Sequence, residues 1–213
     1  MDGVLINDEV LWMKYEVTLF DELFGKKIAA QIGDTVGVSS RTIFAKAQSL
    51  GFDKPIDDTF QKWDDVAFEI YDKSNITPGI EKLGSFLVKN GFKLGIVSSS
   101  RMSWINRVLP RLPFKNSIAK IISLADRADL LPKPAPDGYN EMMKVLKVKP
   151  ENTIILEDSN SGIKSATASG AFVISISENS IPGYKQIDIA NAKAKSILEV
   201  IEVVKKWLAE KKN

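Results

Sequence analysis

The 213-residue chain contains neither cysteine nor histidine. The lack of cysteine excludes disulfide bonds, thiolate metal sites and cysteine nucleophiles, and it is typical of an intracellular protein. The lack of histidine excludes imidazole zinc sites, Ser-His-Asp triads and histidine general bases. Any catalysis by residues 1–213 must therefore rest on carboxylates, lysine, arginine and hydroxyl groups.

The sequence also has little net charge and no long apolar run. The formal net charge is +2, and the basic residues are spread along the chain rather than grouped. No run approaches the roughly 18 apolar residues of a membrane span, and no basic segment leads into an apolar stretch as in a secretory signal. We expect a cytoplasmic globular protein with neither a nucleic-acid nor a membrane partner. The sequence indicates no oligomeric state.

Short apolar runs alternate with amphipathic segments over most of the chain. The apolar runs predict buried parallel strands at 94–97, 153–156 and 172–176, with a weaker one at 121–123. The amphipathic segments predict helices at 80–90, 137–146, 159–169 and about 196–208. This alternation predicts an α/β protein with a doubly wound, mostly parallel, Rossmann-like sheet.

Residues 10–76 have a different pattern. They show no convincing strand, and their apolar residues form helical stripes such as Leu11, Tyr15 and Leu19. Pro78 and Gly79 then end one helix before the next begins. We therefore predict an α/β core domain of residues 1–9 and 77–213, and an inserted α-helical domain of residues 10–76.

Polar residues stand where the predicted strands end. Ser98 follows one strand, Glu157 and Asp158 follow another, Asp2 opens the chain, and Lys133 lies in a proline-stiffened loop. Ligands of open α/β sheets bind outside the carboxyl ends of the strands, so we expect these residues to converge.

These residue types suit phosphoryl transfer. Adjacent carboxylates supply oxygen ligands for Mg²⁺. A lysine and a serine hydroxyl can hold phosphate oxygens, and Asp2 could protonate a leaving oxygen and then activate water. Each segment alone has a structural explanation, as a helix cap, a strand-to-helix loop or a surface turn. Their occurrence together and in order favours the functional interpretation.

Four segments match, in order, the motifs of the haloacid dehalogenase-like phosphotransferases, and the sequence resembles that family over nearly its whole length. The segments are Asp2-Gly3-Val4-Leu5-Ile6, Ile96-Val97-Ser98-Ser99-Ser100, Lys133-Pro134-Ala135-Pro136-Asp137 and Leu156-Glu157-Asp158-Ser159 with Gly162-Ile163. The chain looks like the branch of phosphoglycolate phosphatases, sugar-phosphate phosphatases and β-phosphoglucomutases, which carry a helical cap where residues 10–76 stand. The resemblance implies a Mg²⁺-dependent phosphatase acting on a small phosphorylated metabolite, such as a sugar phosphate or phosphoglycolate.

Carried over by position, the resemblance gives roles to eight residues. They are Asp2 (acid/base, with its carbonyl on the metal), Ser98 and Ser99 (phosphate), Lys133 (the transferring phosphoryl group), Glu157 and Asp158 (Mg²⁺), and Ser40 and Arg41 of the cap (substrate).

The sequence departs from the family pattern at three points. The nucleophilic aspartate of the family would stand two residues before Asp2, ahead of Met1, and we expect residues 1–213 alone to be inactive for lack of it. Asn7 stands where an aspartate is common. Trp12 stands where mutases tend to have histidine, which disfavours a mutase.

Two alternatives stay open beside the phosphatase, while the Glu157-Asp158 pair argues against a halide-releasing dehalogenase. One is a β-phosphoglucomutase-like phosphotransferase. The other is a non-catalytic protein that keeps the fold and a phosphate or metal pocket.

Overall fold

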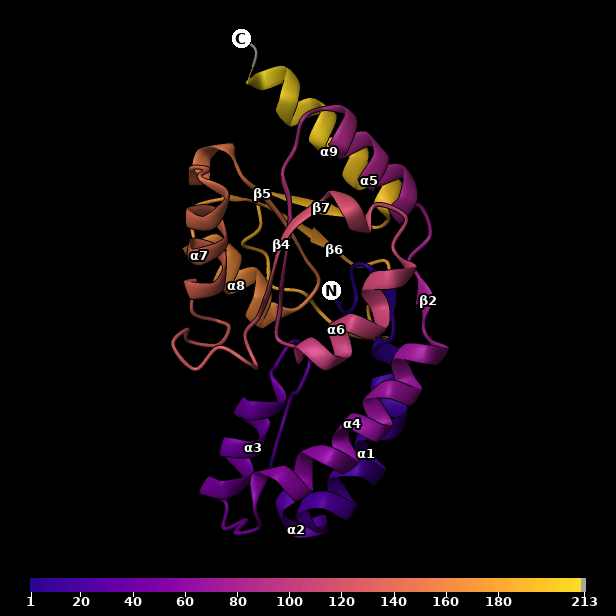
Figure 1. Cartoon of the computed structure of the whole chain (residues 1–213), viewed down its shortest axis with the longest axis vertical. Helices are drawn as coiled ribbons and strands as arrows, with labels where there is room; N and C mark the ends of the chain where they lie inside the picture. Colours follow the sequence, from indigo (N-terminus) through magenta and orange to yellow (C-terminus); the bar gives the residue numbers. More distant parts are fainter. Residues whose placement is uncertain (212–213) are drawn as a thin grey trace.

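The chain forms an α/β unit and a second unit made of helices, which lie at opposite ends of the molecule (Figure 1). The structure is a computed structural model that describes residues 1–211, except for the side chains of residues 56–58. The second unit consists of α1 (Glu9–Phe24), α2 (Lys26–Ala29), α3 (Ser40–Ser49) and α4 (Ile56–Lys73). Two short antiparallel strands join it to the α/β unit, namely β1 (Ile6–Asn7) and β2 (Asn75–Ile76).

The α/β unit contains five further strands. They are β3 (Leu94–Ser98), β4 (Ile118–Ser123), β5 (Ile154–Glu157), β6 (Phe172–Ile176) and β7 (Ala192–Ala194). Its helices are α5 (Ile80–Lys89), α6 (Met102–Val108), α7 (Asp137–Leu146), α8 (Asn160–Ala168) and α9 (Ile197–Glu210). All pairs among these five strands are parallel, with α7 and α8 on one side and α5 and α9 on the other (Figure 1). The predicted α/β fold class with a helical cap is confirmed.

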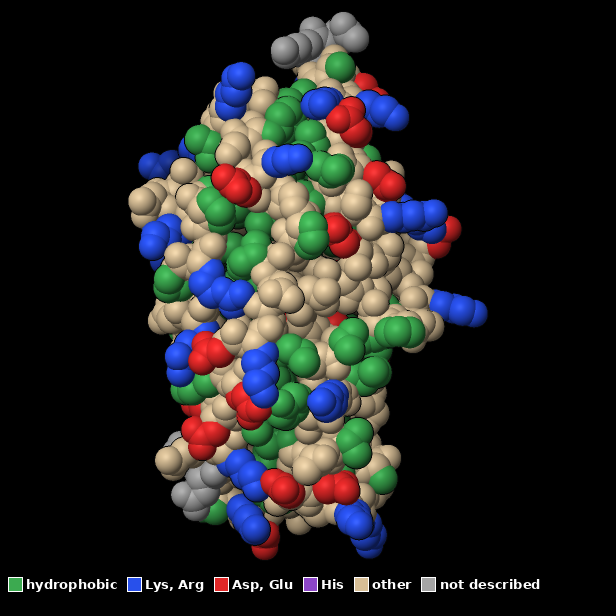
Figure 2. Space-filling view, turned by 90° about the vertical axis from the view of Figure 1, so that its right-hand side faces the viewer, with side chains coloured by type: hydrophobic (Ala, Val, Ile, Leu, Met, Phe, Trp, Pro, Cys, Tyr) green, Lys and Arg blue, Asp and Glu red, His purple; other side chains and the backbone are tan. Residues whose placement is uncertain are grey.

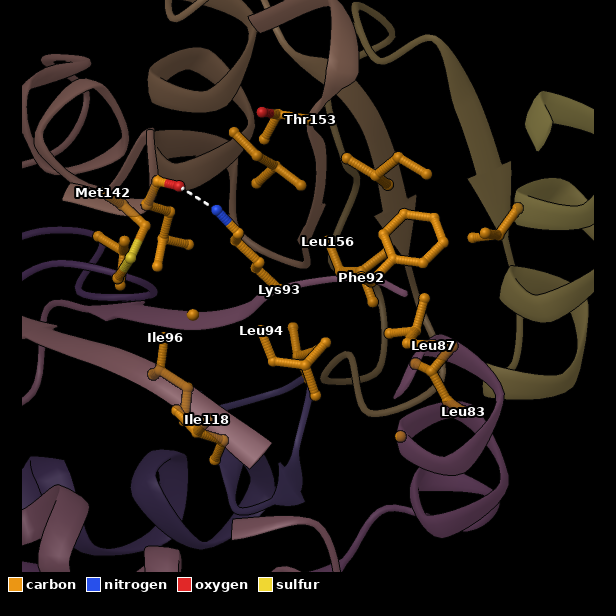
Figure 3. A pocket seen from close by; sticks show the side chains of 18 of the residues that line it. Leu83, Leu87, Phe92, Lys93, Leu94, Ile96, Ile118, Met142, Thr153 and Leu156 are labelled. Atoms are coloured by element: carbon orange, nitrogen blue, oxygen red, sulfur yellow. Dashed lines mark hydrogen bonds between the residues drawn. The ribbon is translucent and has the colours of Figure 1, made fainter. Parts of the chain in front are cut away.

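The strands form two separate groups, β3–β4 and β5–β6–β7. β3 pairs with β4 along one edge, and β5 pairs with β6 along one edge. Within residues 1–211, no strand pairs with the other edge of β3 or of β5. Residues of both edges line a mostly apolar cavity of about 480 Å³. Leu83 of α5, Leu94 of β3 and Leu156 of β5 are among the side chains drawn around it in Figure 3. The backbone groups of two parallel edges therefore lack strand partners beside an apolar space.

The predicted elements differ from the observed ones mainly at their ends. The strand predicted at 153–156 lies one residue later, at Ile154–Glu157, and the weak strand at 121–123 begins earlier, at Ile118. The prediction of no strand in residues 10–76 misses Asn75–Ile76, because two residues are too few for a periodic pattern.

The surface shows mixed charge on the side seen in Figure 2, where lysine and arginine alternate with aspartate and glutamate. In the part of the chain that the structure describes, no helix combines the length and hydropathy of a membrane span.

Candidate active site

Three hydroxyl groups hold the carboxylate of Asp2. Its Oδ1 accepts a hydrogen bond from the Tyr71 hydroxyl at 2.8 Å. Its Oδ2 accepts from Ser100 Oγ at 2.6 Å and faces Ser98 Oγ at 3.3 Å. Ser98 is the last residue of β3, and Tyr71 belongs to α4 of the helical unit. The structure thus brings Asp2 and Ser98 together, and a residue of the helical unit completes the group.

A second buried acid, Asp8, lies beside Asp2. Its Oδ1 accepts from the Gly3 backbone N–H at 3.1 Å, and its Oδ2 has no hydrogen-bond partner within the described residues. Burial, with the negative charge of Asp2, raises the pKa of Asp8 well above its usual value. Burial also acts to raise the pKa of Asp2, but the charge of the Met1 ammonium and the hydrogen bonds from Ser100 and Tyr71 outweigh it and lower that pKa. Asp8 therefore holds a proton more readily than Asp2 does.

Lys133 and Glu157 form a buried ion pair, with side chains only 7% and 5% exposed. The Tyr139 hydroxyl donates a second hydrogen bond to the same oxygen of Glu157. Burial acts to raise the pKa of Glu157, but the charge of Lys133 outweighs it and lowers the pKa below its usual value. Gly162 makes room for this carboxylate, because a side chain there would overlap Glu157 Oε2.

Asp158 is 8% exposed, and its carboxylate makes no hydrogen bond or ion pair with the residues that the structure describes. Burial first, and then the charge of Glu157, raise the pKa of Asp158 to about 7. Gly3 has a φ of +62° and no room for a side chain, because a Cβ there would overlap Asp158 Oδ2. The residue after Asp2 must therefore be a glycine, because only a residue without a side chain leaves room there for the Asp158 carboxylate.

The other predicted site residues lie nearer the helical unit. Ser99 Oγ donates to the Gly37 carbonyl at 3.0 Å, and Ser161 Oγ donates to the same carbonyl at 3.2 Å. Ser40, the first residue of α3, is 3% exposed and its Oγ has no partner in the described residues. Arg41 is exposed and is not among the residues that line a pocket. Its substrate role stays a prediction.

A pocket of about 320 Å³ lies between the helical unit and the core, and Asp2 forms part of its wall. Trp12, Tyr71 and Trp104 line it with mutual ring-centroid distances of 5.5–6.0 Å. Glu9 and Glu16 also line it. Burial is the main cause that raises the pKa of Glu9 to about 9 and that of Glu16 to about 7. The wall of the pocket therefore contains both aromatic rings and acidic groups whose ionisation is made unfavourable by burial.

Several residues of this arrangement were not predicted. Tyr71 and Tyr139 reach the carboxylates from positions far away in the sequence, and no local pattern signals such contacts. Asp8 and Glu9 directly follow the first motif, so their proximity to Asp2 was the one available signal.

Several known proteins resemble this chain in sequence or in fold. A model of the family described as haloacid dehalogenase-like hydrolase matches residues 1–176. Hexitol phosphatase B of Escherichia coli O157:H7 is 24% identical over 217 residues, covering 94% of this chain and 91% of that protein. Phosphoglycolate phosphatase of Nitrosococcus oceani is 23% identical over 165 residues, covering 74% and 70%. The solved β-phosphoglucomutase structure from Clostridium difficile shares the fold with a TM-score of 0.75 at 21% identity, covering 98% of this chain and 94% of that one.

Proposed function

The chain belongs to the haloacid dehalogenase-like hydrolase family, and on that premise we propose that it is a Mg²⁺-dependent phosphatase of small phosphate monoesters. The substrate class is a cytoplasmic sugar phosphate or phosphoglycolate-like metabolite. The main support is the convergence of Asp2, Ser98 and Ser100 at the end of β3, with Asp158 next to Gly3. A carboxylate fixed by hydroxyl groups beside a second, unpartnered carboxylate suits acid/base work next to a metal-bound phosphate.

Asp158 fits a Mg²⁺ ligand. Mg²⁺ takes one or two carboxylates together with substrate oxygens and water, so it does not need a dense cluster of protein ligands. This suits a site where the described residues contain no group of three or more metal-binding side chains. Glu157 is already engaged by Lys133 and Tyr139, and we assign it the role of holding Lys133 in place. When bound, Mg²⁺ would neutralise charge on the phosphate oxygens.

The protein groups then divide the work. Asp2, held by Tyr71 and Ser100, gives its proton to the leaving oxygen as the aspartyl-phosphate forms, and then accepts a proton from the water that attacks the phosphorus. Lys133 and Ser98 stabilise charge on the phosphoryl oxygens. The aspartyl-phosphate forms on an aspartate two positions before Asp2, as the family motif has it, outside residues 1–213.

The test compares two polypeptides that differ at one position. Both carry an apolar strand before residue 1, with either Asp or Asn two positions before Asp2. The Asp form should release inorganic phosphate from phosphate esters with Mg²⁺, and the Asn form should be slower by a factor of order a million. Residues 1–213 without the strand should show trace rates only. Equal rates for the Asp and Asn forms would refute the aspartyl-phosphate.

Asp158→Asn in the Asp form tests the metal role. We expect a loss of Mg²⁺-dependent turnover of at least about 100-fold, with unchanged or higher stability because a buried repulsion with Glu157 is removed. Near-normal Mg²⁺-dependent turnover would overturn the assignment. Net phosphate release, rather than transfer to a second hydroxyl of the sugar, would separate a phosphatase from a mutase.

A further inference from the structure

The pocket beside Asp2 is acidic. Glu9, Glu16 and Asp34 line it, and among the described residues its wall includes no lysine or arginine. Glu16 Oε2 accepts from Thr35 Oγ at 2.6 Å, and the side chain of Glu9 makes no hydrogen bond within the described residues although it is only 8% exposed. The pocket therefore offers hydrogen-bond acceptors without a cation to satisfy them.

Two features of this pocket suit a ligand. Ser40 lines it with a hydroxyl that is buried and lacks a partner in the described part of the chain. A buried polar group of this kind is usually satisfied by a ligand or an ordered water. Trp12 and Trp104, 5.5 Å apart between ring centroids, form an apolar part of its wall. Such a wall suits the C–H faces of a carbon chain whose hydroxyls point to the acids.

We propose that this pocket selects a neutral, polyhydroxylated leaving group, a sugar or sugar alcohol, and rejects esters that carry a carboxylate in addition to the phosphate. The inference rests on the proposed function and chooses between its two substrate classes, favouring sugar phosphates over phosphoglycolate-like esters. At neutral pH the Glu9 carboxyl is protonated and can both donate to and accept from substrate hydroxyls, and Glu16 accepts charge-assisted bonds where it is ionised. A substrate carboxylate would bring one more negative charge into a site with no basic partner, which is unfavourable at short range.

A matched pair of esters tests the selection. Sorbitol phosphate and phosphogluconate have the same open six-carbon chain, and one ends in a hydroxymethyl group where the other ends in a carboxylate. With the active Asp form and Mg²⁺, we expect kcat/KM to favour sorbitol phosphate by at least about tenfold. Equal rates, or a preference for phosphogluconate or phosphoglycolate, would overturn the proposal.

Two variants locate the selectivity. Glu16→Gln combined with Asp34→Asn should lower the preference at least severalfold, mainly by improving KM for phosphogluconate, because negative charge is removed from the wall. Glu22→Gln is the control, since Glu22 lies on the same helix and pairs with Lys62 at 2.5 Å outside the pocket. An unchanged preference in the double variant would remove Glu16 and Asp34 from the specificity site.

The two proposals fail in different ways. No phosphate release from any ester, p-nitrophenyl phosphate included, would refute the proposed function. In that case the shift in melting temperature with sorbitol phosphate against that with phosphogluconate still tests the pocket, and a larger shift with phosphogluconate would overturn the inference.

Discussion

The buried acids of the site have different surroundings at its two ends. The core end contains Lys133 and Glu157 of the α/β unit, and the cap end contains Glu9 and Glu16 of the helical unit. At the core end, Lys133 neutralises Glu157, whose pKa falls below its usual value although burial acts to raise it. At the cap end, Glu9 and Glu16 form no ion pair with lysine or arginine in the described residues, and burial raises their pKa values to about 9 and about 7. One end has its charge fixed by an ion pair, and the other holds carboxyl groups whose ionisation is disfavoured by burial.

This difference shows how one site can treat two halves of a substrate. Under the proposed function, the phosphate is an anion that meets a cation held in place before binding, namely Lys133, which Glu157 and Tyr139 position. Under the proposed selection, hydrogen bonds recognise the leaving group, and acids without a cation discriminate between neutral and anionic ligands. The predictions below test each half of this comparison.

Lys133→Met should have the largest effect, because it breaks the core end. It leaves Glu157 buried without its cation, which costs about 3–5 kcal/mol of unfolding free energy. In the Asp form it should also lower kcat by about 100- to 1000-fold. Urea denaturation and phosphate release measure the two effects. Lys149→Met is the control, because Lys149 and Glu151 form an exposed pair at 3.9 Å that contributes little. Similar losses in both variants would contradict the comparison.

The sequence predicted the core end better than the cap end for a physical reason. Strand-end residues such as Ser98 and Asp158 are placed by the parallel sheet itself, so their order in the chain implies their meeting in space. The contacts of Tyr71 with Asp2 and of Gly37 with Ser99 depend on how the helical unit packs against the core. No periodicity within either segment encodes that packing.

The sheet shows a second limit. The apolar runs predicted strands β3, β5 and β6 to within about one residue, because a buried parallel strand is apolar on both faces. The same apolar runs do not indicate which strands pair with each other in the sheet. The separation into β3–β4 and β5–β6–β7, with a cavity between them, is visible only in the structure.

Gly37→Ala should have an intermediate effect, because Gly37 lies where the loop before α3 contacts the α/β core. Gly37 has a φ of +72°, and a Cβ there would overlap Ser159, which caps α8 and contacts Glu157. The loop must move away from the core, and we expect kcat/KM of the Asp form to fall by about 10- to 100-fold. Gly25→Ala is the matched control, because Gly25 has a φ of +79° but nothing within 4 Å of its Cβ position, and it does not line the pocket. Both variants carry the backbone strain of about 1–2 kcal/mol, so equal activity losses would show that the contact with Ser159 is unimportant.

Glu16→Gln should have the smallest effect, and it isolates the cap end through pH. Burial raises the pKa of Glu16 to about 7 in the folded protein, above the value of 4.5 for the free group. The folded state therefore binds more protons than the unfolded state between about pH 4.5 and 7, so stability falls as pH rises through that range. Glu16→Gln removes this contribution, of order 1 kcal/mol after allowance for solvent screening. Unfolding free energies at pH 5, 6, 7 and 8 should decline less steeply in the variant than in the wild type, while Glu22→Gln, whose side chain is half-exposed, should follow the wild type. Parallel curves for Glu16→Gln and the wild type would mean that Glu16 is solvated in the folded protein, and the cap end would then lack one of the buried acids that set it apart from the core end.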